Sequence, residues 1–497
     1  MKKILIANRG EIAVRIIRSC REAGLRTVAI FSDTDRTSLH VQMADEAYRI
    51  GPPPANKSYL QINRILDIAE QSCADAIHPG YGFLSENFGF AEAVQKKGLI
   101  WIGPPPEAMS LLGDKVIARQ IAEKAVVPVI PGSGSPVKNL DAAKKVASDI
   151  GFPILVKAVG GGGGKGMRIV MNMNELKSAF KRARSEAAAA FDDDRLFIEK
   201  YFPSPHHIEI QIVADKFGNV VTFPERECSI QRRYQKIIEE TPSPIIKRTL
   251  WKKMASAAQK ICLNTGYQGV GTVEFLVDES KNFYFLEINT RLQVEHPITE
   301  EITGVDLVRE QLSITAGSKL SFLQEDINIT GHSIECRIYA EDGFQAFIPS
   351  VGTINELILP EGPGIRFDHA LQAGQEITPY YDPLLGKLIV YDESREKALL
   401  RMIRALRECK IGGIATTIPF CIAVLEHLQF QKGNYTTDFV ANEMDKLRDT
   451  TADQHYLLIA AAIAAWHSRH YSTTITPEKE ISTKTPWKQI GRLENLR

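Results

Sequence analysis

Residues 283–297, FYFLEINTRLQVEHP, carry a row of polar side chains directly after two aromatic rings. Successive side chains of a strand point to opposite faces, so as a strand this stretch would turn its odd-numbered residues to one side. That face would hold Phe283, Phe285, Glu287, Asn289, Arg291, Gln293 and Glu295, with Tyr284, Leu286 and Ile288 on the other. The chain advances about 13 Å from Glu287 to Arg291. This length leaves room for a metal at one end and a second anion at the other.

A strand with one face exposed to solvent is the ordinary explanation for such alternation. Two features favour a functional face instead. Asn is a poor strand former, and a carboxylate next to an amide oxygen is the kind of hard ligand pair that Mg²⁺ binds.

Bulk composition limits the class of protein. The 497 residues predict two to four domains, and 44% apolar with 24% charged residues are typical of a globular chain. A net charge of zero argues against a nucleic acid or an acidic membrane as the main partner. Seven scattered cysteines indicate reduced thiols. The N-terminal apolar run is too short for a signal peptide, and the apolar run at 456–466 is too short for a membrane span, so we expect a cytoplasmic protein.

The order of expected elements predicts an α/β and α+β multidomain chain. Strands alternate with helices through residues 1–113, as in a Rossmann-like parallel layer, although the first strand is followed by a single glycine and not by a dinucleotide fingerprint. A second domain would span 114–330, with a compact glycine-rich part at about 131–203. From 331 to 446 short strands with turns and one helix predict an α+β domain. Residues 447–497 form a helical and polar tail.

A run of five glycines followed by Lys165 and Gly166 lies between two apolar strands. Such a run lets backbone N–H groups close over an anion, but its spacing excludes a P-loop. The alternative is that the glycine run is a flexible linker, and the apolar strands on both sides of it argue against that. Lys157 on the entering strand and Lys115 form a plausible pair for phosphates, because a lysine in an apolar strand needs an anionic partner.

Three further groups of polar residues are candidates for the same site as residues 283–297. Glu274, on an expected strand at 271–277, would join Glu287 and Asn289 as oxygen ligands of Mg²⁺. His207, Glu209 and Gln211 share one strand face; a lone histidine is usually structural, and no second one has zinc spacing. Lys236 and Arg291 beside Glu295 indicate a second anion that must lose a proton.

Six stretches together resemble the biotin carboxylases, the ATP-grasp components of biotin-dependent carboxylases. They are residues 7–13 (ANRGEIA), 78–87 (HPGYGFLSEN), Lys157 with the glycine run, 229–236 (SIQRRYQK), 287–297 and 335–338 (ECRI). The resemblance implies an N-terminal Rossmann-like domain (1–113), an ATP-grasp domain (114–330) with a mobile lid at about 131–203, and a C-terminal biotin carboxylase domain (331–446). It also implies carboxylation of biotin with ATP and bicarbonate, through carboxyphosphate.

The resemblance further implies a role for each matching residue. The ATP site would comprise Lys115, Lys157, Gly162, Gly163, Gly164, Gly166, Glu199, Lys200, Phe202, His207, Gln231 and Tyr234. Metal ligands for Mg²⁺ or Mn²⁺ would be Glu274, Glu287 and Asn289. Bicarbonate would be bound by Lys236, Arg291, Gln293, Val294 and Glu295, and biotin by Arg337. Glu295, Arg291, Lys236 and Arg337 would be catalytic, and we expect Asp382 to orient Arg337.

Some features depart from the family pattern or point to partners. Tyr234 stands where many members have His, and the chain contains no Met-Lys-Met biotin acceptor. We therefore expect either that biotin arrives on a separate carrier protein or that this chain is a fragment of a longer one. A carboxyltransferase subunit would select the final acceptor. Arg15 and Arg18 match a family dimer surface, which predicts a homodimer. The alternatives are another ATP-grasp carboxylate–amine ligase, against which Arg337 argues, and a non-catalytic assembly subunit.

Overall fold

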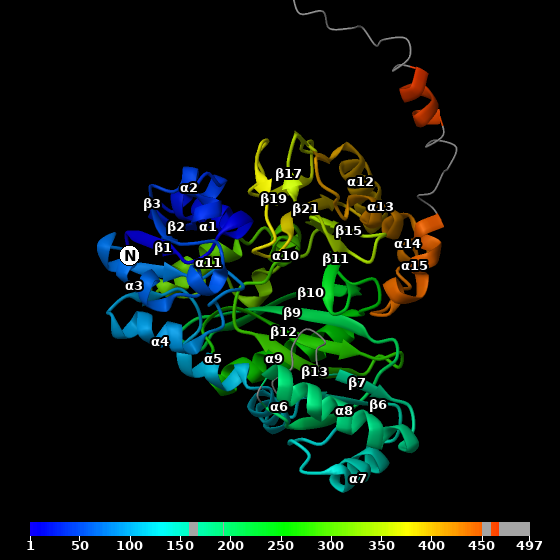
Figure 1. Ribbon diagram of the computed structural model, residues 1–497. Helices are drawn as coiled ribbons and strands as arrows, with labels where there is room; N and C mark the ends of the chain where they lie inside the picture. Colours follow the sequence, from blue (N-terminus) through cyan, green and yellow to red (C-terminus); the bar gives the residue numbers. More distant parts are fainter. Residues whose placement is uncertain (159–166, 192, 450–458, 467–497) are drawn as a thin grey trace, which may run out of the picture. The chain divides into compact units, whose positions relative to one another are not determined.

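A computed structural model describes residues 1–158, 167–191, 193–449 and 459–466 (Figure 1). Contacts divide the chain into one compact unit, residues 1–448, and a second unit that begins at residue 449. The described part of the second unit is helical at 459–466. None of the helices in these ranges has the length and apolar character that crossing a bilayer requires. The predicted glycine lid residues Gly162, Gly163, Gly164 and Gly166 lie outside the described residues.

The N-terminal part is the parallel α/β layer that the sequence predicts. Its sheet has the order β3-β2-β1-β4-β5, and all neighbouring strands run parallel. The strands are β1 (Lys3–Ile6), β2 (Arg26–Ser32), β3 (Glu46–Gly51), β4 (Ala76–His78) and β5 (Ile100–Trp101). The helices are α1 (Gly10–Glu22), α2 (Leu39–Met43), α3 (Ile62–Gln71), α4 (Phe88–Lys96) and α5 (Pro106–Gly113). Strand β3 and helices α2 and α5 were not predicted, because they are short or interrupted by polar residues.

A larger sheet, mostly antiparallel, forms the centre of the unit. Its order is β13-β12-β9-β10-β11-β14-β21-β19. The strands are β9 (His206–Ala214), β10 (Val220–Arg232), β11 (Gln235–Thr241), β12 (Gly269–Val277), β13 (Phe283–Asn289), β14 (His332–Tyr339), β19 (Ile365–His369) and β21 (Leu384–Asp392). Because β11 pairs with β14, hydrogen bonds run without a break across the predicted domain boundary at residue 330. The ATP-grasp and C-terminal parts therefore share one sheet.

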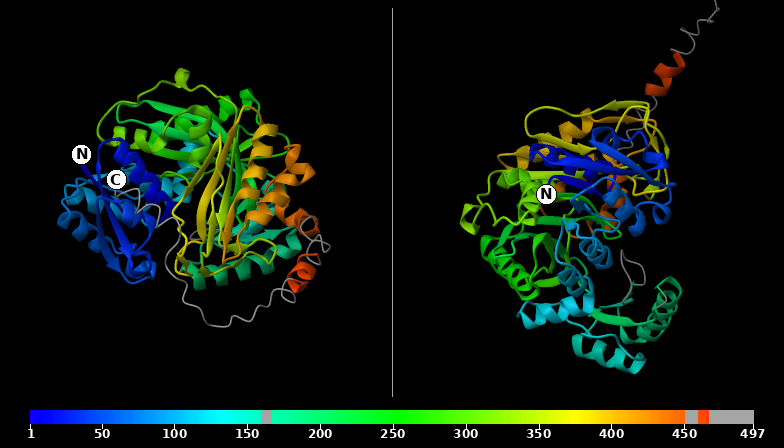
Figure 2. Two further views of the ribbon diagram at one scale, coloured as in Figure 1. Left: turned by 90° about the horizontal axis from the view of Figure 1, so that it is seen from above. Right: turned by 90° about the vertical axis from the view of Figure 1, so that its left-hand side faces the viewer.

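A small subdomain carries its own apolar core. Strands β6 (Ile154–Ala158), β7 (Met167–Val170) and β8 (Leu196–Lys200) form a sheet in the order β7-β6-β8, which packs with α7 (Leu140–Ile150) and α8 (Met173–Phe191). The core includes Ile154, Val156 and Ile198, all fully buried. Figure 2 (right) shows these elements gathered at one end of the unit. They fall within the predicted lid, whose mobility stays a prediction.

The remaining elements cover the large sheet or close its ends. Helices α6 (Lys115–Lys124) and α9 (Arg248–Thr265) pack against strands of the ATP-grasp part, and α10 (His296–Thr303) contacts β11, β14 and β21. The other helices are α11 (Leu307–Thr315), α12 (Arg395–Glu408), α13 (Ile418–Glu426), α14 (Leu428–Gln431) and α15 (Phe439–Asp449). Short strands are β15 (Glu341–Asp342), β16 (Ile348–Pro349), β17 (Gly352–Thr353), β18 (Glu356–Ile358), β20 (Glu376–Ile377) and β22 (Lys410–Gly412). Strands β17 and β18 follow each other closely in the chain but belong to different sheets.

Strand β13 departs from the predicted alternation at Leu286. Glu287 lies opposite Glu274 of β12, but Phe285 lies opposite the next residue, Phe275, so Leu286 is the extra residue of a β-bulge. Phe285 and Ile288 consequently pack in the same apolar cluster. The prediction that the aromatic rings share a face with Glu287 is wrong, because a bulge reverses the facing of every residue beyond it.

The end of β13 also differs from a continuous polar strand. The strand stops at Asn289 and α10 begins at His296, so residues 290–295 form a loop between them. Arg291, Gln293 and Glu295 therefore lie on this loop, and their placement does not follow strand alternation.

A buried carboxylate joins the large sheet to the C-terminal helices. Glu240 of β11 accepts hydrogen bonds from Arg395 Nε and Nη2 at 2.7 and 2.9 Å. It also contacts His332 Nε2 at 2.7 Å and accepts from the Tyr435 hydroxyl. Burial alone would raise the pKa of Glu240, but hydrogen bonds from His332 and Arg395 lower it to about 2. Glu240 is therefore ionised and holds three chain segments together.

We predict that Glu240→Gln destabilises the protein by about 3–5 kcal/mol at pH 7, because Arg395 keeps a buried charge without its partner. A lowered pKa gives stability that is present above the unfolded value of 4.5 and is lost as the pH falls through about 2. The difference in urea unfolding midpoint between wild type and variant should therefore shrink from pH 5 to pH 2.5. Glu361→Gln, at an exposed position, is the control. An equal difference at both pH values would contradict this assignment.

Candidate active site

The candidate site lies on the face of the large sheet where strands β9, β11 and β12 present charged residues. In the register of these antiparallel strands, Glu274 of β12 lies opposite Glu209 of β9 on one side and Glu287 of β13 on the other. His207, Glu209 and Gln211 are all buried on β9. The polar stripe predicted on this strand therefore faces the protein interior.

Lys236 is the centre of the charged cluster. Its Nζ lies 3.0 Å from Glu274 Oε1 and 2.9 Å from Glu295 Oε1, and it forms an ion pair with Glu209. Burial alone would lower the pKa of Lys236, but the three carboxylates raise it well above its ordinary value. The ammonium therefore stays charged and holds three carboxylates from three different segments.

Arg226 of β10 completes the cluster, and the sequence analysis missed it. Its side chain is 0% exposed. It donates to Glu209 Oε2 at 3.1 Å, Gln211 Oε1 at 2.7 Å and Gln293 Oε1 at 2.6 Å, and also to the hydroxyls of Thr272 and Thr299. The sequence signal was an arginine between two glutamates in a charge-dense segment, which does not separate a buried arginine from a solvated one.

The loop after β13 is held from several sides. Gln293 donates from Nε2 to Glu274 Oε1 at 2.9 Å, so its amide bridges Arg226 and Glu274. Arg291 donates from Nη2 to Asn289 Oδ1 at 3.0 Å, and its Nε lies 3.0 Å from Glu86 Oε2. Glu86 belongs to the N-terminal layer, and its partnership with Arg291 was not predicted. The loop is thus tied to both the sheet and the N-terminal layer.

Glu295 and Arg337 meet where the C-terminal strand β14 joins the sheet. Arg337 Nη2 lies 2.8 Å from Glu295 Oε2, and Arg337 Nε donates to Glu239 Oε1 at 2.6 Å. Burial would raise the pKa of Glu295, as would Glu209, but Lys236 and Arg337 lower it below its usual range. Glu295 is therefore a carboxylate between two cations.

Glu239, and not Asp382, orients Arg337. Burial raises the pKa of Glu239 to about 7, although Arg337 opposes that rise. Asp382 Oδ1 instead accepts from the backbone N–H of Leu384 at 2.9 Å. The expectation that Asp382 orients Arg337 is therefore wrong, because the pairing of β11 with β14 places Glu239 beside Arg337.

A second hollow lies between the small subdomain and the edge of the large sheet. It is lined by Lys115, Arg119, Ile130, Lys157, Phe197, Glu199, Phe285, Leu286 and Glu287. Lys115 Nζ is 3.3 Å from Glu287 Oε2, and Lys157 Nζ is 2.5 Å from Glu199 Oε2. Two lysines predicted to bind phosphate thus face one hollow, each paired with a carboxylate.

Four other residues predicted to bind the nucleotide are not among those that line this hollow: Phe202, Lys200, Gln231 and Tyr234. The Phe202 ring stacks on Tyr284 with centroids 4.9 Å apart. Lys200 Nζ donates to the carbonyls of Gly151 and Phe152 at 3.2 and 2.9 Å, within its own subdomain. Gln231 is buried opposite Lys236, whereas Tyr234 is 58% exposed on the β10–β11 turn with a φ of +67°.

His207 of β9 also contacts the charged cluster. Its Nε2 lies 3.1 Å from Glu274 Oε2 and 3.4 Å from Glu209 Oε1. Burial lowers the pKa of His207, but Glu274 outweighs burial and raises it to about 9. His207, Glu209 and Glu274 offer atoms within 4.8 Å of one another, as metal ligands would. In this structure the three side chains contact one another as an ion-pair cluster.

The predicted metal ligands lie on two neighbouring strands. Glu274 and Glu287 are directly opposite in the register of β12 and β13, and Asn289 Nδ2 donates to Glu274 Oε1 at 2.8 Å. Two carboxylates and an amide oxygen are hard donors that suit a divalent cation such as Mg²⁺. The residue types and their grouping therefore fit the predicted metal.

Comparisons with known proteins match nearly the whole compact unit. Residues 1–109 match the biotin carboxylase N-terminal domain, and 335–442 match the biotin carboxylase C-terminal domain. Residues 114–323 match the ATP-binding domain of the carbamoyl-phosphate synthase L chain. These ranges follow the order of the N-terminal layer, the ATP-grasp part and the C-terminal strands.

Individual relatives are similar over the same length. The chain is 51% identical to a biotin carboxylase of Halalkalibacterium halodurans over 443 residues, covering 89% of this chain and 98% of that protein. It is 46% identical to the propionyl-CoA carboxylase alpha chain of Ruegeria pomeroyi, covering 94% of this chain and 72% of that protein. The chain belongs to the biotin carboxylase family.

A solved structure extends the likeness to the fold. The biotin carboxylase domain dimer of Hydrogenobacter thermophilus 2-oxoglutarate carboxylase, in complex with MgADP, ADP and bicarbonate, matches with a TM-score of 0.86 and 48% identity. The match covers 89% of this chain and 97% of that chain. The three-part fold that the sequence predicted is confirmed.

We predict that Arg226→Met destabilises the protein by about 3–5 kcal/mol, because Glu209, Gln211 and Gln293 would lose a buried charged donor. The measurement is the urea unfolding midpoint at pH 7. Arg233→Met, at an exposed position of the β10–β11 turn, is the matched control and should leave the midpoint unchanged. Equal midpoints for the two variants would show that Arg226 is not a structural centre of the cluster.

Proposed function

We propose that this chain is a biotin carboxylase, which uses ATP and bicarbonate to carboxylate biotin on a carrier protein. The observation that carries the proposal is the position of Glu295, a buried carboxylate between Lys236 and Arg337. Lys236 reaches it from the ATP-grasp part, and Arg337 reaches it from the C-terminal part. Family membership is consistent with the same chemistry.

ATP is proposed to bind in the hollow between the small subdomain and the large sheet. Lys115 and Lys157 face this hollow and would hold phosphate oxygens, because a lysine ammonium is a point charge that suits phosphate. Each now pairs with a carboxylate, Glu287 or Glu199, which a nucleotide would replace or share. Glu199, Lys200, Phe202, His207, Gln231 and Tyr234 complete the proposed ATP site, together with the glycines outside the described residues.

Glu274, Glu287 and Asn289 would hold Mg²⁺, or Mn²⁺, beside the phosphates. When bound, the metal supplies neutralisation of the phosphate charge that builds up during phosphoryl transfer. The residues of the chain do the remaining work. Lys236 and His207 already compensate Glu274, so its carboxylate is ionised before any ligand arrives.

Bicarbonate is proposed to bind at the loop that follows β13. Arg291 and Lys236 would hold its negative charge, and Gln293 with the Val294 backbone would fix its orientation. Glu295 would accept the bicarbonate proton, which makes the oxygen a better nucleophile for the γ-phosphate. Its lowered pKa keeps Glu295 ionised and ready to accept that proton.

Arg337 is proposed to stabilise the second half of the reaction. Carboxyphosphate breaks down to CO₂ and phosphate, and the phosphate takes the N–H proton of biotin. The resulting enolate oxygen carries negative charge that the Arg337 guanidinium would stabilise, while the nitrogen attacks CO₂. Glu239 would keep Arg337 in place by accepting a hydrogen bond from its Nε.

Another ATP-grasp carboxylate–amine ligase is the second candidate, since residues 114–323 match a carbamoyl-phosphate synthase domain. That domain alone accounts for Lys236, Glu274 and Glu295. The contact of Arg337 with Glu295 favours biotin carboxylation, because Arg337 comes from the C-terminal part, outside that match.

We predict that the protein hydrolyses ATP faster when free biotin is added with bicarbonate, and that carboxybiotin accumulates. Glu295→Gln should lower this rate by about 10²–10⁴-fold, because the amide cannot accept the proton. ATP affinity, measured by calorimetry, should stay within about twofold of the wild type. Glu279→Gln, exposed on the β12–β13 turn, is the matched control. If the rate of ATP hydrolysis does not change with biotin and no carboxybiotin forms, the proposed function is rejected.

The partners follow from this function. Biotin would be delivered on a separate carrier protein, and a carboxyltransferase subunit would select the acceptor. A relative forms a dimer in its crystal structure, and we propose a homodimer for this chain too. Arg15 is buried and contacts Glu300 and Asp306 of its own chain, so of the two predicted residues only Arg18 is exposed. The cytoplasmic location stays a prediction.

We predict that Arg18→Glu weakens the dimer, because it reverses one charge on the exposed face of α1. Sedimentation at micromolar concentration should give a dimer for the wild type and a larger monomer fraction for the variant. Arg248→Glu, exposed on α9, makes the same charge change elsewhere and should sediment like the wild type. A monomeric wild type would contradict the homodimer itself.

A further inference from the structure

Lys387 is a fully buried lysine that none of the proposed roles uses. It lies on β21, and its side chain is 0% exposed. In the sheet register it stands beside Arg337 of β14 on one side and Asp368 of β19 on the other. Residues directly opposite in paired strands point to the same face. Lys387 therefore faces the loop that carries Glu295, as Arg337 does.

The contacts of Lys387 reach the proposed bicarbonate segment. Its Nζ donates to the carbonyl oxygen of Val294 at 2.9 Å. Two carboxylates balance its charge, Glu11 Oε2 at 3.3 Å and Asp368 Oδ2 at 3.9 Å. Asp368 is already held in a fork by Arg366, at 3.0 and 2.8 Å. Glu11 is therefore the carboxylate that depends most on Lys387.

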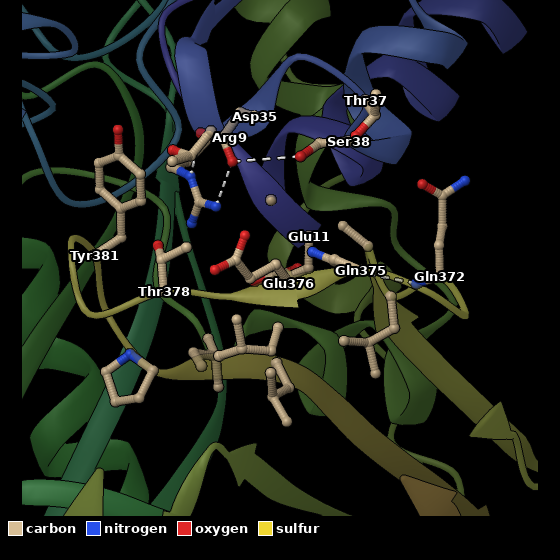
Figure 3. Close-up of a pocket in the computed structure, with 18 of the residues that line it drawn as sticks. Arg9, Glu11, Asp35, Thr37, Ser38, Gln372, Gln375, Glu376, Thr378 and Tyr381 are labelled. Atoms are coloured by element: carbon tan, nitrogen blue, oxygen red, sulfur yellow. Dashed lines mark hydrogen bonds and ion pairs between the residues drawn. The ribbon is translucent and has the colours of Figure 1, made fainter. Parts of the chain in front are cut away.

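Glu11 lies in the first turn of α1 and is 6% exposed. Neither of its carboxylate oxygens has a hydrogen-bond partner among the described residues, apart from the longer ion pair with Lys387. It also lines a cavity of about 550 Å³ between the N-terminal layer and the C-terminal strands (Figure 3). Burial raises the pKa of Glu11 to about 7, and Lys387 opposes the rise. The pair thus links the N-terminal layer to the active-site loop.

We propose that Lys387 is a positioning residue for bicarbonate, which holds the Val294 carbonyl while Glu11 serves as its counterion. This inference rests on the proposed function. Two cations on adjacent strands hold two consecutive residues of the loop: Arg337 holds the Glu295 side chain, and Lys387 holds the Val294 carbonyl. Because a peptide group is planar, fixing this carbonyl also fixes the Glu295 N–H and the position of the Glu295 Cα, from which the side chain leaves the backbone.

Replacement of Lys387 should therefore affect bicarbonate more than ATP. Among the described residues, Lys387 contacts none that lines the nucleotide hollow, so loss of its hydrogen bond would loosen the Val294–Glu295 peptide and leave Lys115 and Lys157 in place. A general loss of stability would instead change the apparent affinities for both substrates together. The ratio of the two KM changes separates a positioning role from a structural one.

The experiment measures biotin-dependent ATP hydrolysis by the full chain, with bicarbonate and ATP varied in turn. For Lys387→Met we expect the KM for bicarbonate to rise about tenfold, equivalent to about 1.4 kcal/mol, while the KM for ATP stays within twofold. Lys252→Met, at an exposed position on α9, is the matched control and should keep both values. An unchanged KM for bicarbonate, or an equal rise in both, would overturn the proposal.

A second variant covers the case in which Lys387→Met fails to fold. Glu11→Gln keeps the volume of the side chain but removes the counterion, and we expect a rise of about threefold in the KM for bicarbonate alone, about 0.65 kcal/mol. A wild-type KM for bicarbonate in this variant would overturn the link between Glu11 and Lys387. Failure of the wild type to make carboxybiotin would instead reject the proposed function, so the two failures are distinguishable.

Discussion

The burial of carboxylates that must be compensated by cations is the constraint on which the rest of this structure depends. Glu209, Glu274 and Glu295 lie together in the interior, where an unpaired charge is very costly. Lys236 and Arg226 compensate them. Each cation contacts several segments, so the cluster fixes β9, β12 and the loop after β13 in one arrangement. The same ion pairs keep the carboxylates ionised, which is the state that metal binding and proton transfer require.

The shared sheet explains why the site needs more than the ATP-grasp part. Strand β14 continues the sheet directly from β11, and this pairing brings Arg337 to Glu295 and Glu239. Strand β21, the next strand of the sheet, adds Lys387, which lies opposite Arg337. From the opposite side, the N-terminal layer supplies Glu86 to Arg291 and Glu11 to Lys387. The loop at 290–295 is thus held by side chains from all three parts of the compact unit.

Much of the fold and part of the site were predictable from local patterns. The alternation of strands and helices through residues 1–113 predicted the parallel N-terminal layer, because parallel strands need crossover helices between them. The alternation at His207, Glu209 and Gln211 identified a polar strand face. The bulge at Leu286 could not be predicted, since it depends on the register with β12. Arg226, Glu86 and Glu239 were missed for a related reason: a charged residue carries no sequence signal that it is buried, and their partners lie elsewhere in the sequence.

The sequence by itself determined the family, the order of the three parts and the residue types that phosphate, metal and bicarbonate chemistry need. These follow from short motifs and local periodicity, which depend on neighbouring residues alone. Only the tertiary structure decided which charges pair, that Glu239 and not Asp382 supports Arg337, and that Lys387 reaches the Val294 carbonyl. Such contacts join residues that are far apart in the chain: Arg337 and Glu239 are 98 positions apart. Strand order and register set them, and neither can be read from a single stretch of chain.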